Sequence, residues 1–223
     1  MRIEIWADVV CPWCYLGKRR LERALETFPH REQVVTVHRA FQLDPARPRD
    51  ETESRRGMLM TKYRLTPERV AEMDAQMEAR ASADGLEFHL TEAGVTGNTL
   101  DAHQLLLLAA DRGRQHRGLD RLYRAYFTEQ RSVFDRDSLV VLGGDVGLDP
   151  AEVRDVFAQD RYADAVLADR HEAEGLGVTG VPFFVIDRRF GISGAQPVAF
   201  FGDALARAWE ASHGAPVETS APT

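Results

Sequence analysis

The sequence predicts an α/β fold in which a block of helices interrupts a small unit of strands and helices. Apolar and polar residues alternate over residues 2–6, helical spacing dominates residues 50–160, and a dense run of β-forming residues follows at 181–186. Alternation is the period of a half-buried strand, whereas apolar residues that recur every three or four positions are typical of helices. With 223 residues, of which 44% are hydrophobic, the chain can bury a substantial core.

The first part of the chain predicts a strand, a helix and a second strand. Behind the alternating residues 2–6, the side chains of Leu16, Leu21 and Leu25 fall near one helical face. Residues 33–43 then have an extended pattern, which prolines stop. A strand, a helix and a strand in this order predict a parallel pair of strands joined by a right-handed crossover.

Helical periodicity then takes over in residues 49–160, which we predict to be an all-helical insertion. Thr66 followed by Pro67 is typical of a helix start, with an N-cap and a first-turn proline. The run of leucines at 105–108 is apolar on nearly all sides of a helix, so this helix is expected to form the buried centre of the insertion.

Strands return in the last third of the chain. Residues 162–176 have a helical pattern, and Pro182 precedes the dense β run, where it belongs at the first residue of the strand because it cannot donate to a central ladder. Residues 190–193 are expected to pair antiparallel with that strand, and residues 197–211 to form a closing helix. The predicted division is a discontinuous unit of residues 1–48 and 161–213, the insertion of residues 49–160, and a disordered tail of residues 214–223.

Two cysteines, Cys11 and Cys14, lie where the first strand gives way to the first helix. Free N–H groups and the partial positive charge at a helix start favour an anion, so a cysteine there is expected to form the reactive thiolate readily. Pro12 suits the first helical turn, which needs no N–H from it. With two residues between them, the sulfurs can form a local and easily exchanged disulfide. The pattern predicts redox chemistry.

Two other interpretations of the cysteine pair have less support. Structural zinc needs two further ligands, whereas the chain has only these two cysteines and its seven histidines form no pair at zinc-finger spacing. Two unrelated core cysteines would seldom open a helix beside a proline. We therefore predict no metal at this site.

Charge and composition exclude further classes of function. The net charge of -7 argues against a nucleic-acid-binding protein. No apolar stretch is long enough to span a membrane, and the sequence begins in its first strand without a leader-like segment, which predicts a cytoplasmic protein. Because thiols are held reduced in the cytoplasm, Cys-x-x-Cys there favours a catalytic or redox-sensing role over a permanent brace.

Together these features resemble a known family. Cys-x-x-Cys at a strand-to-helix start, an inserted helical block, and Gly-Val-Thr-Gly-Val-Pro at 177–182 ahead of a late strand resemble the DsbA family of thioredoxin-fold oxidoreductases. The segments 8–15, 98–103 and 193–197 are more narrowly similar to its FrnE-like branch. The resemblance covers residues 1–212 and implies a thioredoxin-like fold, βαβ…αββα, interrupted by the helical insertion.

The resemblance also implies roles for individual residues. Cys11 would be the exposed nucleophile that forms a mixed disulfide, and Cys14 the more buried sulfur that resolves it. Pro182 would be a cis proline facing the cysteines, and Val181 would offer backbone groups to an extended substrate.

Pro12 and Trp13 lie between the two sulfurs and are expected to tune the reduction potential. The dipeptide does not set a direction, because members of the family act as oxidants, reductants or isomerases. We therefore predict a thiol-disulfide oxidoreductase that acts on protein or small-molecule thiols and disulfides, with no metal or organic cofactor.

Two alternative functions remain open at this stage. The same branch resembles glutathione-dependent isomerases and transferases of the 2-hydroxychromene-2-carboxylate isomerase and kappa types, for which glutathione would be the co-substrate and in which serine typically replaces the first cysteine. The second alternative is a redox-regulated, chaperone-like binding protein. It is suggested by Met58, Met60, Met73 and Met77, since methionine suits promiscuous apolar surfaces.

Three further residues are candidate neighbours of the cysteines. Asp8 lies three residues before Cys11, where it can act on a proton of Cys14 or cap the turn. Asn98 or Thr99 is the candidate N-cap of the helix that carries His103, and His103 is placed near the site, in the core or on the surface.

Overall fold

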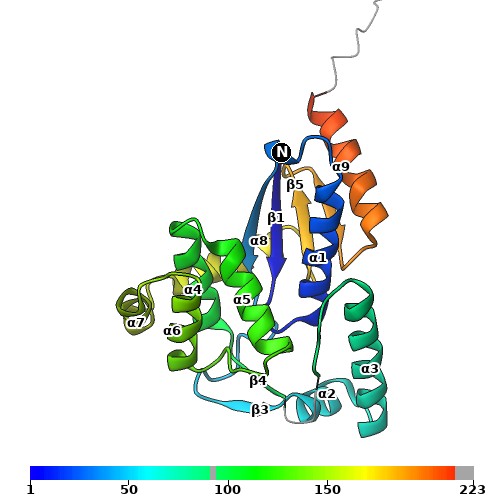
Figure 1. Ribbon diagram of the computed structural model, residues 1–223. Helices are drawn as coiled ribbons and strands as arrows, with labels where there is room; N and C mark the ends of the chain where they lie inside the picture. Colours follow the sequence, from blue (N-terminus) through cyan, green and yellow to red (C-terminus); the bar gives the residue numbers. More distant parts are fainter. Residues whose placement is uncertain (91–93, 214–223) are drawn as a thin grey trace, which may run out of the picture.

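A four-stranded sheet forms the centre of the computed structural model, which describes residues 1–90 and 94–213 (Figure 1). Its strand order is β2-β1-β5-β6. The strands are β1 (Arg2–Ala7), β2 (Val35–Ala40), β5 (Phe183–Ile186) and β6 (Phe190–Ser193). β1 pairs parallel with β2 and antiparallel with β5, and β5 pairs antiparallel with β6. The predicted parallel opening and antiparallel closing pair are confirmed.

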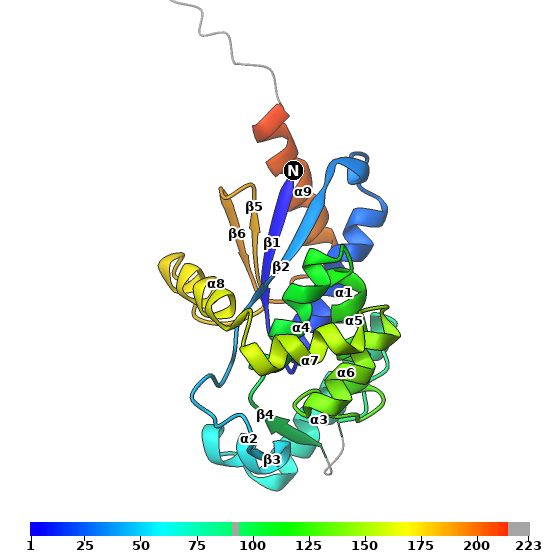
Figure 2. The ribbon, with the colours of Figure 1, turned by 90° about the vertical axis from the view of Figure 1, so that its left-hand side faces the viewer.

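Helices cover both faces of this sheet. α1 (Pro12–Glu26) and α9 (Val198–His213) lie on one face, and α8 (Ala163–Gly175) lies on the other (Figure 2). The alternation along β1 explains the arrangement: Ile3 and Ile5 join the large apolar cluster on the side of α1, whereas Trp6 packs with Ala173 of α8. The carboxyl end of β1 and the start of α1 point toward the insertion (Figure 1).

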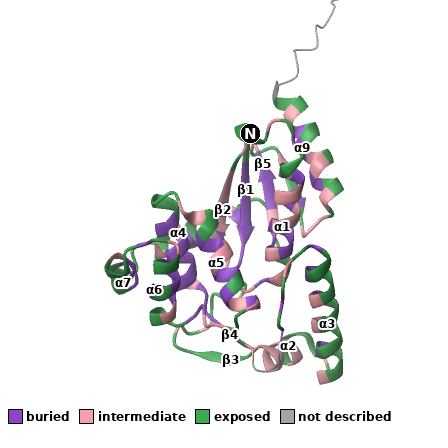
Figure 3. Cartoon of the chain, in the orientation of Figure 1, coloured by how far each residue is buried: buried purple, intermediate pink, exposed green. Residues whose placement is uncertain are grey.

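Six helices make up most of the described part of the insertion between β2 and α8. They are α2 (Arg55–Tyr63), α3 (Pro67–Ala83), α4 (Leu100–Asp111), α5 (Gln115–Phe127), α6 (Arg136–Asp145) and α7 (Pro150–Gln159). Thr66 caps α3 by accepting from the Arg69 N–H, as predicted. α4 is buried along most of its length, whereas α3 is largely exposed (Figure 3). The prediction that the leucine-rich helix is the buried centre of the insertion is confirmed.

The insertion is not entirely helical, which corrects the prediction. β3 (Thr52–Ser54) and β4 (Val95–Gly97) form a separate antiparallel pair. All three residues of β3 are exposed, so they lack the alternation of apolar side chains from which strands are predicted. The two strands are about forty residues apart in the chain, and the pairing therefore depends on the surrounding helices.

Other boundaries differ from the prediction by a few residues. The second strand was predicted over residues 33–43, but the 3₁₀ helix η1 (Arg31–Gln33) precedes it and the strand is Val35–Ala40. The predicted domain boundaries at residues 48 and 160 fall in the loop before β3 and at the C-cap of α7. The predicted tail of residues 214–223 lies outside the described residues. Within the described chain, no helix has the length and apolar character that crossing a membrane requires.

Candidate active site

Cys11 is the N-cap residue of α1, and Pro12 occupies the first helical position. The Cys11 carbonyl accepts from the N–H groups of Cys14 and Tyr15 at 3.0 and 3.3 Å, which closes the first turn of the helix. The Cys11 N–H in turn donates to the Asp8 carbonyl at 3.2 Å. The thiol therefore lies at the end of a helix where its dipole favours an anion.

A second segment, far along the chain, meets Cys11. The Cys11 Sγ donates to the Val181 carbonyl at 3.7 Å, and the Val181–Pro182 peptide bond is cis. The Pro182 carbonyl accepts from the Gly194 N–H at 2.8 Å, so this loop is continuous with the β5–β6 pair. Of the predicted supporting residues, Val181 thus contacts Cys11, and Pro182 follows it across the cis bond.

Cys14 is the more deeply buried of the two sulfurs. Both cysteines are free thiols, and Cys14 is 1% exposed. Burial raises the pKa of the Cys14 thiol well above its usual value, and the neighbouring Cys11 and the charge of Asp8 raise it further. A hydrogen bond with the Asp8 backbone acts in the opposite direction on this pKa. The surroundings of Cys14 therefore favour its neutral thiol.

Cys11 opens into a cavity of about 430 Å³ between the thioredoxin-like unit and α2 and α3. Its own side chain is recessed, with 5% of the residue exposed, although the family resemblance implies an exposed nucleophile. The reason is that the walls of the cavity cover it. One wall carries Cys11, Pro12, Trp13 and Val181. The other, from α2 and α3, includes Met58, Leu59, Lys62, Tyr63, Met73, Asp74 and Met77.

Contacts from α1 hold α3 over the cysteines. The Arg80 guanidinium lies 5.4 Å from the centre of the Trp13 ring, a cation–π arrangement. Asp84, the C-cap of α3, binds Arg20 and Arg23 of α1 at 2.8 Å each. Trp13 thus contacts the insertion and also lines the cavity. Sequence patterns do not indicate this contact with Arg80.

Asp8 and His103 form a buried contact beside the cavity, and Asn98 makes separate, partly buried contacts. Asp8 Oδ1 lies 3.3 Å from His103 Nε2, and its Oδ2 accepts from the Leu43 N–H at 2.7 Å. His103 therefore reaches the cysteine loop through Asp8. Asn98 accepts from the Leu100 N–H at 2.8 Å, beside the N-cap Thr99, and donates to the Arg47 carbonyl at 2.6 Å. Its contacts hold the loop ahead of β3 rather than the cysteines.

Gly17 is a site residue that our sequence reasoning missed. A Cβ at this position would lie 2.9 Å from Cγ of Pro182 and 3.2 Å from Cζ of Phe184. Glycine therefore lets α1 approach the Pro182 loop closely. A glycine inside a helix costs about 1 kcal/mol of stability relative to alanine. A glycine in the predicted first helix was therefore the sequence feature that could have indicated a close packing contact.

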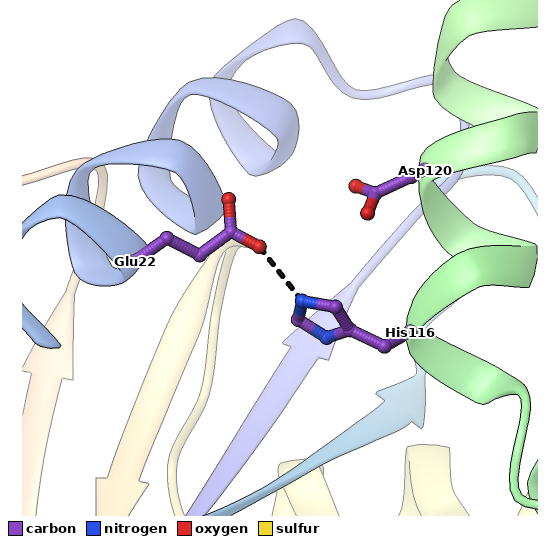
Figure 4. Close-up of side chains that lie close together, drawn as sticks. All are labelled: Glu22, His116 and Asp120. Atoms are coloured by element: carbon purple, nitrogen blue, oxygen red, sulfur yellow. Dashed lines mark hydrogen bonds and ion pairs between the residues drawn. The ribbon is translucent and has the colours of Figure 1, made fainter. Parts of the chain in front are cut away.

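A second cluster lies on the flank of α1, where Glu22 faces His116 and Asp120 of α5 (Figure 4). One ligand atom from each lies within 4.8 Å of the others, a spacing that would suit a metal ion. The Lys18 ammonium, however, lies 2.5 Å from both the Glu22 and Asp120 carboxylates and 3.5 Å from His116 Nε2. It already occupies the point at which these acceptors converge, so the cluster is a neutralised ion-pair network that ties α1 to the insertion.

His38 lies beneath this network. Burial lowers its pKa to about 3, and the charges of Lys18 and His116 act in the same direction. Neither ring nitrogen of His38 has a hydrogen-bond partner in the described part of the chain. Burial acts to raise the pKa of Glu22, but the bonds from His116 and Lys18 outweigh it and lower this pKa to about 2.

Known proteins resemble this chain in structure or in sequence. The crystal structure of a probable DsbA oxidoreductase from Streptomyces coelicolor is 47% identical in sequence, with a TM-score of 0.91 over 98% of this chain and 93% of that one. The protein YwbO of Bacillus subtilis (strain 168) is 25% identical over 187 residues, covering 83% of this chain and 86% of YwbO.

More distant structures share the fold alone. The cytosolic disulfide reductase DsbM of Pseudomonas aeruginosa is 18% identical, with a TM-score of 0.63 over 93% of this chain and all of that one. A 2-hydroxychromene-2-carboxylate isomerase is 14% identical, with a TM-score of 0.69 over 95% of this chain and 98% of that one. The family model of the DSBA-like thioredoxin domain matches residues 2–206, and the chain therefore belongs to this family.

Proposed function

We propose that the protein is a thiol-disulfide oxidoreductase that exchanges disulfides with protein or small-molecule substrates through Cys11 and Cys14. The observation that carries the proposal is the position of Cys11, at the N-cap of α1 and against the Val181 carbonyl, on the floor of a 430 Å³ cavity. Cys14 lies one turn further along the helix. The identity of 47% to a probable DsbA oxidoreductase supports the same reaction class.

The chemistry proceeds in two exchanges. The Cys11 thiolate attacks one sulfur of a substrate disulfide, and a mixed disulfide forms while the first substrate thiolate leaves and takes a proton from solvent. Cys14 then loses its proton and attacks the Cys11 sulfur, so that the Cys11–Cys14 disulfide forms and the second substrate thiol leaves. The substrate gains two electrons and the cysteine pair loses two. The reverse sequence oxidises a dithiol, and neither direction needs a metal or an organic cofactor.

An equilibrium redox titration against glutathione, with insulin reduction and refolding of a scrambled disulfide protein as activity assays, tests the proposal. We expect a single two-electron transition, and its potential gives the direction of the physiological reaction. Cys11→Ser should lose both activities. The matched variant Cys14→Ser should retain the first exchange and accumulate the mixed disulfide, because the resolving thiol is missing.

A different result would favour the glutathione-dependent alternative. Activity that survives Cys11→Ser and requires added glutathione would contradict the proposal and indicate an isomerase or transferase, in which the reacting thiol belongs to glutathione. Binding of unfolded chains without any Cys11-dependent exchange would instead favour the chaperone-like alternative. Our proposal places the exchange in the cytoplasm, the compartment named for the structural neighbour DsbM.

A further inference from the structure

A buried carboxylate and a buried imidazole lie together at the end of β1. The Asp8 side chain is 1% exposed and the His103 side chain 3%, and Asp8 Oδ1 lies 3.3 Å from His103 Nε2. An ionised carboxylate can only accept hydrogen bonds, so His103 donates the N–H in this contact. The other oxygen, Oδ2, accepts from the Leu43 N–H at 2.7 Å. Two donors, one of them on the insertion helix α4, therefore hold the Asp8 carboxylate in one orientation.

Both the backbone and the side chain of Asp8 act on Cys14. The backbone makes a hydrogen bond with the Cys14 thiol, and the charge of the side chain helps to raise the pKa of that thiol, because it opposes a thiolate. This opposition ends if the carboxylate itself takes the proton, since the pair then carries one negative charge instead of two. Asp8 is thus a suitable acceptor for the proton that Cys14 must lose before it can attack.

Two other groups near Cys14 are unsuited to accept this proton. In the mixed disulfide the Cys11 sulfur is already bonded to the substrate, so it carries no thiolate charge. Tyr123 is fully buried and donates to the Asp8 carbonyl at 3.5 Å. Burial, with the charges of the two cysteines and Asp8, raises its pKa well above the usual value, so its phenol keeps its own proton. Of these three neighbours of Cys14, Asp8 is the one that can accept.

We propose that His103 is a positioning residue of the exchange reaction, which holds the Asp8 carboxylate as the acceptor of the Cys14 proton. The proposal rests on the proposed function and adds the proton acceptor to it. In the second exchange, the proton passes from Cys14 Sγ to Asp8, and the electron pair left on Cys14 Sγ forms the bond to Cys11 Sγ.

The same carboxylate completes the step. The bond between Cys11 Sγ and the substrate sulfur breaks, and the leaving sulfur keeps the electron pair of that bond. It receives the proton from Asp8, which lines the same cavity as Cys11. Asp8 is then a carboxylate again, and no further reactant is needed.

Rapid mixing of the reduced protein with hydroxyethyl disulfide, a small neutral probe, separates the two exchanges. The rate of the first rises with the concentration of the probe, whereas the rate of the second does not. Acid quenching, alkylation and mass spectrometry give the amounts of the mixed disulfide and of the Cys11–Cys14 disulfide. Asp8→Asn keeps the shape of the side chain but removes the acceptor, and we expect it to slow the second exchange about a hundredfold at pH 7.

The pH profile distinguishes a proton acceptor from a packing contact. In the wild type the proton moves within the protein, so the rate of the second exchange should change little between pH 6 and pH 8. In Asp8→Asn the proton must go to solvent, and this rate should rise about tenfold per pH unit. The other charged residues that line the cavity are the same in both proteins, so the difference reports on Asp8; they are Asp44, Arg47, Arg55, Lys62 and Asp74.

Variants of His103 test the positioning role itself. His103→Leu removes the donor and should slow the second exchange about tenfold, whereas His103→Gln keeps an N–H and should remain within about threefold of the wild type. Gln104→Leu is the matched control. Gln104, the next residue of α4, is also buried and bonds to Asp101 and Asp160. Its substitution should leave the ratio of the two exchange rates unchanged.

A titration separates this proposal from the proposed exchange reaction. The ultraviolet absorbance of the Cys14 thiolate is followed against pH in a Cys11→Ser background, in which no exchange is needed. Asp8→Asn should move the appearance of the thiolate to lower pH. His103→Leu should move it in the same direction, because the donor that stabilises the opposing charge of Asp8 is lost.

The two measurements give distinct outcomes. A shifted titration in both variants would support the position of Asp8 at Cys14 even if the wild type exchanged no disulfide, a result that would overturn the proposed function alone. An unmoved titration would overturn the proposal. So would equal slowing by His103→Leu and Gln104→Leu, or a second exchange in Asp8→Asn that keeps the wild-type pH profile.

Discussion

Helix α1 has two surfaces that differ in how their polar groups are satisfied. At its N-terminal end, Cys11 faces a cavity, and its thiol makes one long contact, 3.7 Å, to a backbone carbonyl. On its flank, Lys18 and Glu22 have strong partners on α5, at 2.5 to 2.8 Å. The two surfaces therefore have different roles. The Cys11 thiol at the end of the helix can change its partner, whereas Lys18 and Glu22 on the flank hold the helix against the insertion.

This comparison predicts that flank variants change stability and that variants at the cysteine end change exchange. The largest effect on stability is expected from Lys18→Met, which keeps the apolar stem but leaves two carboxylates facing each other. Removing one partner of a fully buried ion pair costs 3–5 kcal/mol, and because Glu22 and Asp120 are 26% and 47% exposed we expect about 3 kcal/mol here. Urea unfolding measures this loss.

A control variant and an activity assay complete this experiment. Arg19→Met removes a partly exposed charge from the next position of the same helix and should cost less than about 0.5 kcal/mol. Disulfide exchange by folded Lys18→Met should match that of the wild type. A variant as stable as the wild type would show that the network on the flank does not anchor α1.

His38, beneath the flank of α1, makes the stability of the protein depend on pH. Its pKa is about 3 in the folded protein against an ordinary value of 6.5, so below pH 6.5 the unfolded chain binds a proton that the folded protein excludes. The stability that neutral His38 contributes is present above pH 6.5 and is lost as the pH falls toward 3. Between pH 7 and pH 5 this loss amounts to about 2 kcal/mol. His38→Leu should remove it.

Unfolding free energies of the wild type and of His38→Leu, measured at pH 7 and pH 5, test this loss of stability. The pKa of the Glu22 carboxyl is lowered from 4.5 to about 2, so this group changes the stability of the protein mainly below pH 4.5. It contributes little to the difference between pH 7 and pH 5. An NMR titration of the His38 ring is an independent check. Protonation of His38 near pH 6.5 in the folded protein would contradict the prediction.

The two surfaces of α1 also differ in how far the sequence predicted them. The cysteine end was predictable because its signals are local: an alternating strand, two cysteines and a proline at the first helical position all lie within fourteen residues. The flank was not predictable, because Lys18 and His116 are 98 positions apart in the chain. Charged residues on a helix are usually solvated, and only the position of α5 shows that Lys18 is buried.

The same reasoning explains the other differences. The pairing of β3 with β4 joins exposed residues far apart in the chain, so no local pattern indicates it. The enclosure of Cys11 depends on α2 and α3. Trp13–Arg80 and the ion pairs of Asp84 hold α3 to α1, and Arg55–Asp74 holds α2 to α3. The family resemblance placed Val181 and Pro182 beside the cysteines, which neither periodicity nor spacing could do.

A substitution at Gly17 is expected to cost less stability than Lys18→Met or the fall from pH 7 to pH 5. Alanine at this position gains about 1 kcal/mol of helix propensity, but its Cβ would lie 2.9 Å from the Pro182 ring, and overpacking of this kind costs about 1–3 kcal/mol. We expect a net loss of about 1 kcal/mol. Exchange should slow by about tenfold, because the added methyl group pushes α1 and its cysteines away from Val181.

Gly202→Ala is the matched control for Gly17→Ala. Gly202 is also inside a helix, α9, and a Cβ there would meet no atom within 4 Å. This variant should gain about 0.5–1 kcal/mol of stability and leave exchange unchanged. Urea unfolding and the rate of insulin reduction provide the comparison. If Gly17→Ala exchanged disulfides as fast as Gly202→Ala, the close approach of α1 to the Pro182 loop would serve packing alone, and the cysteine end would not depend on it for reactivity.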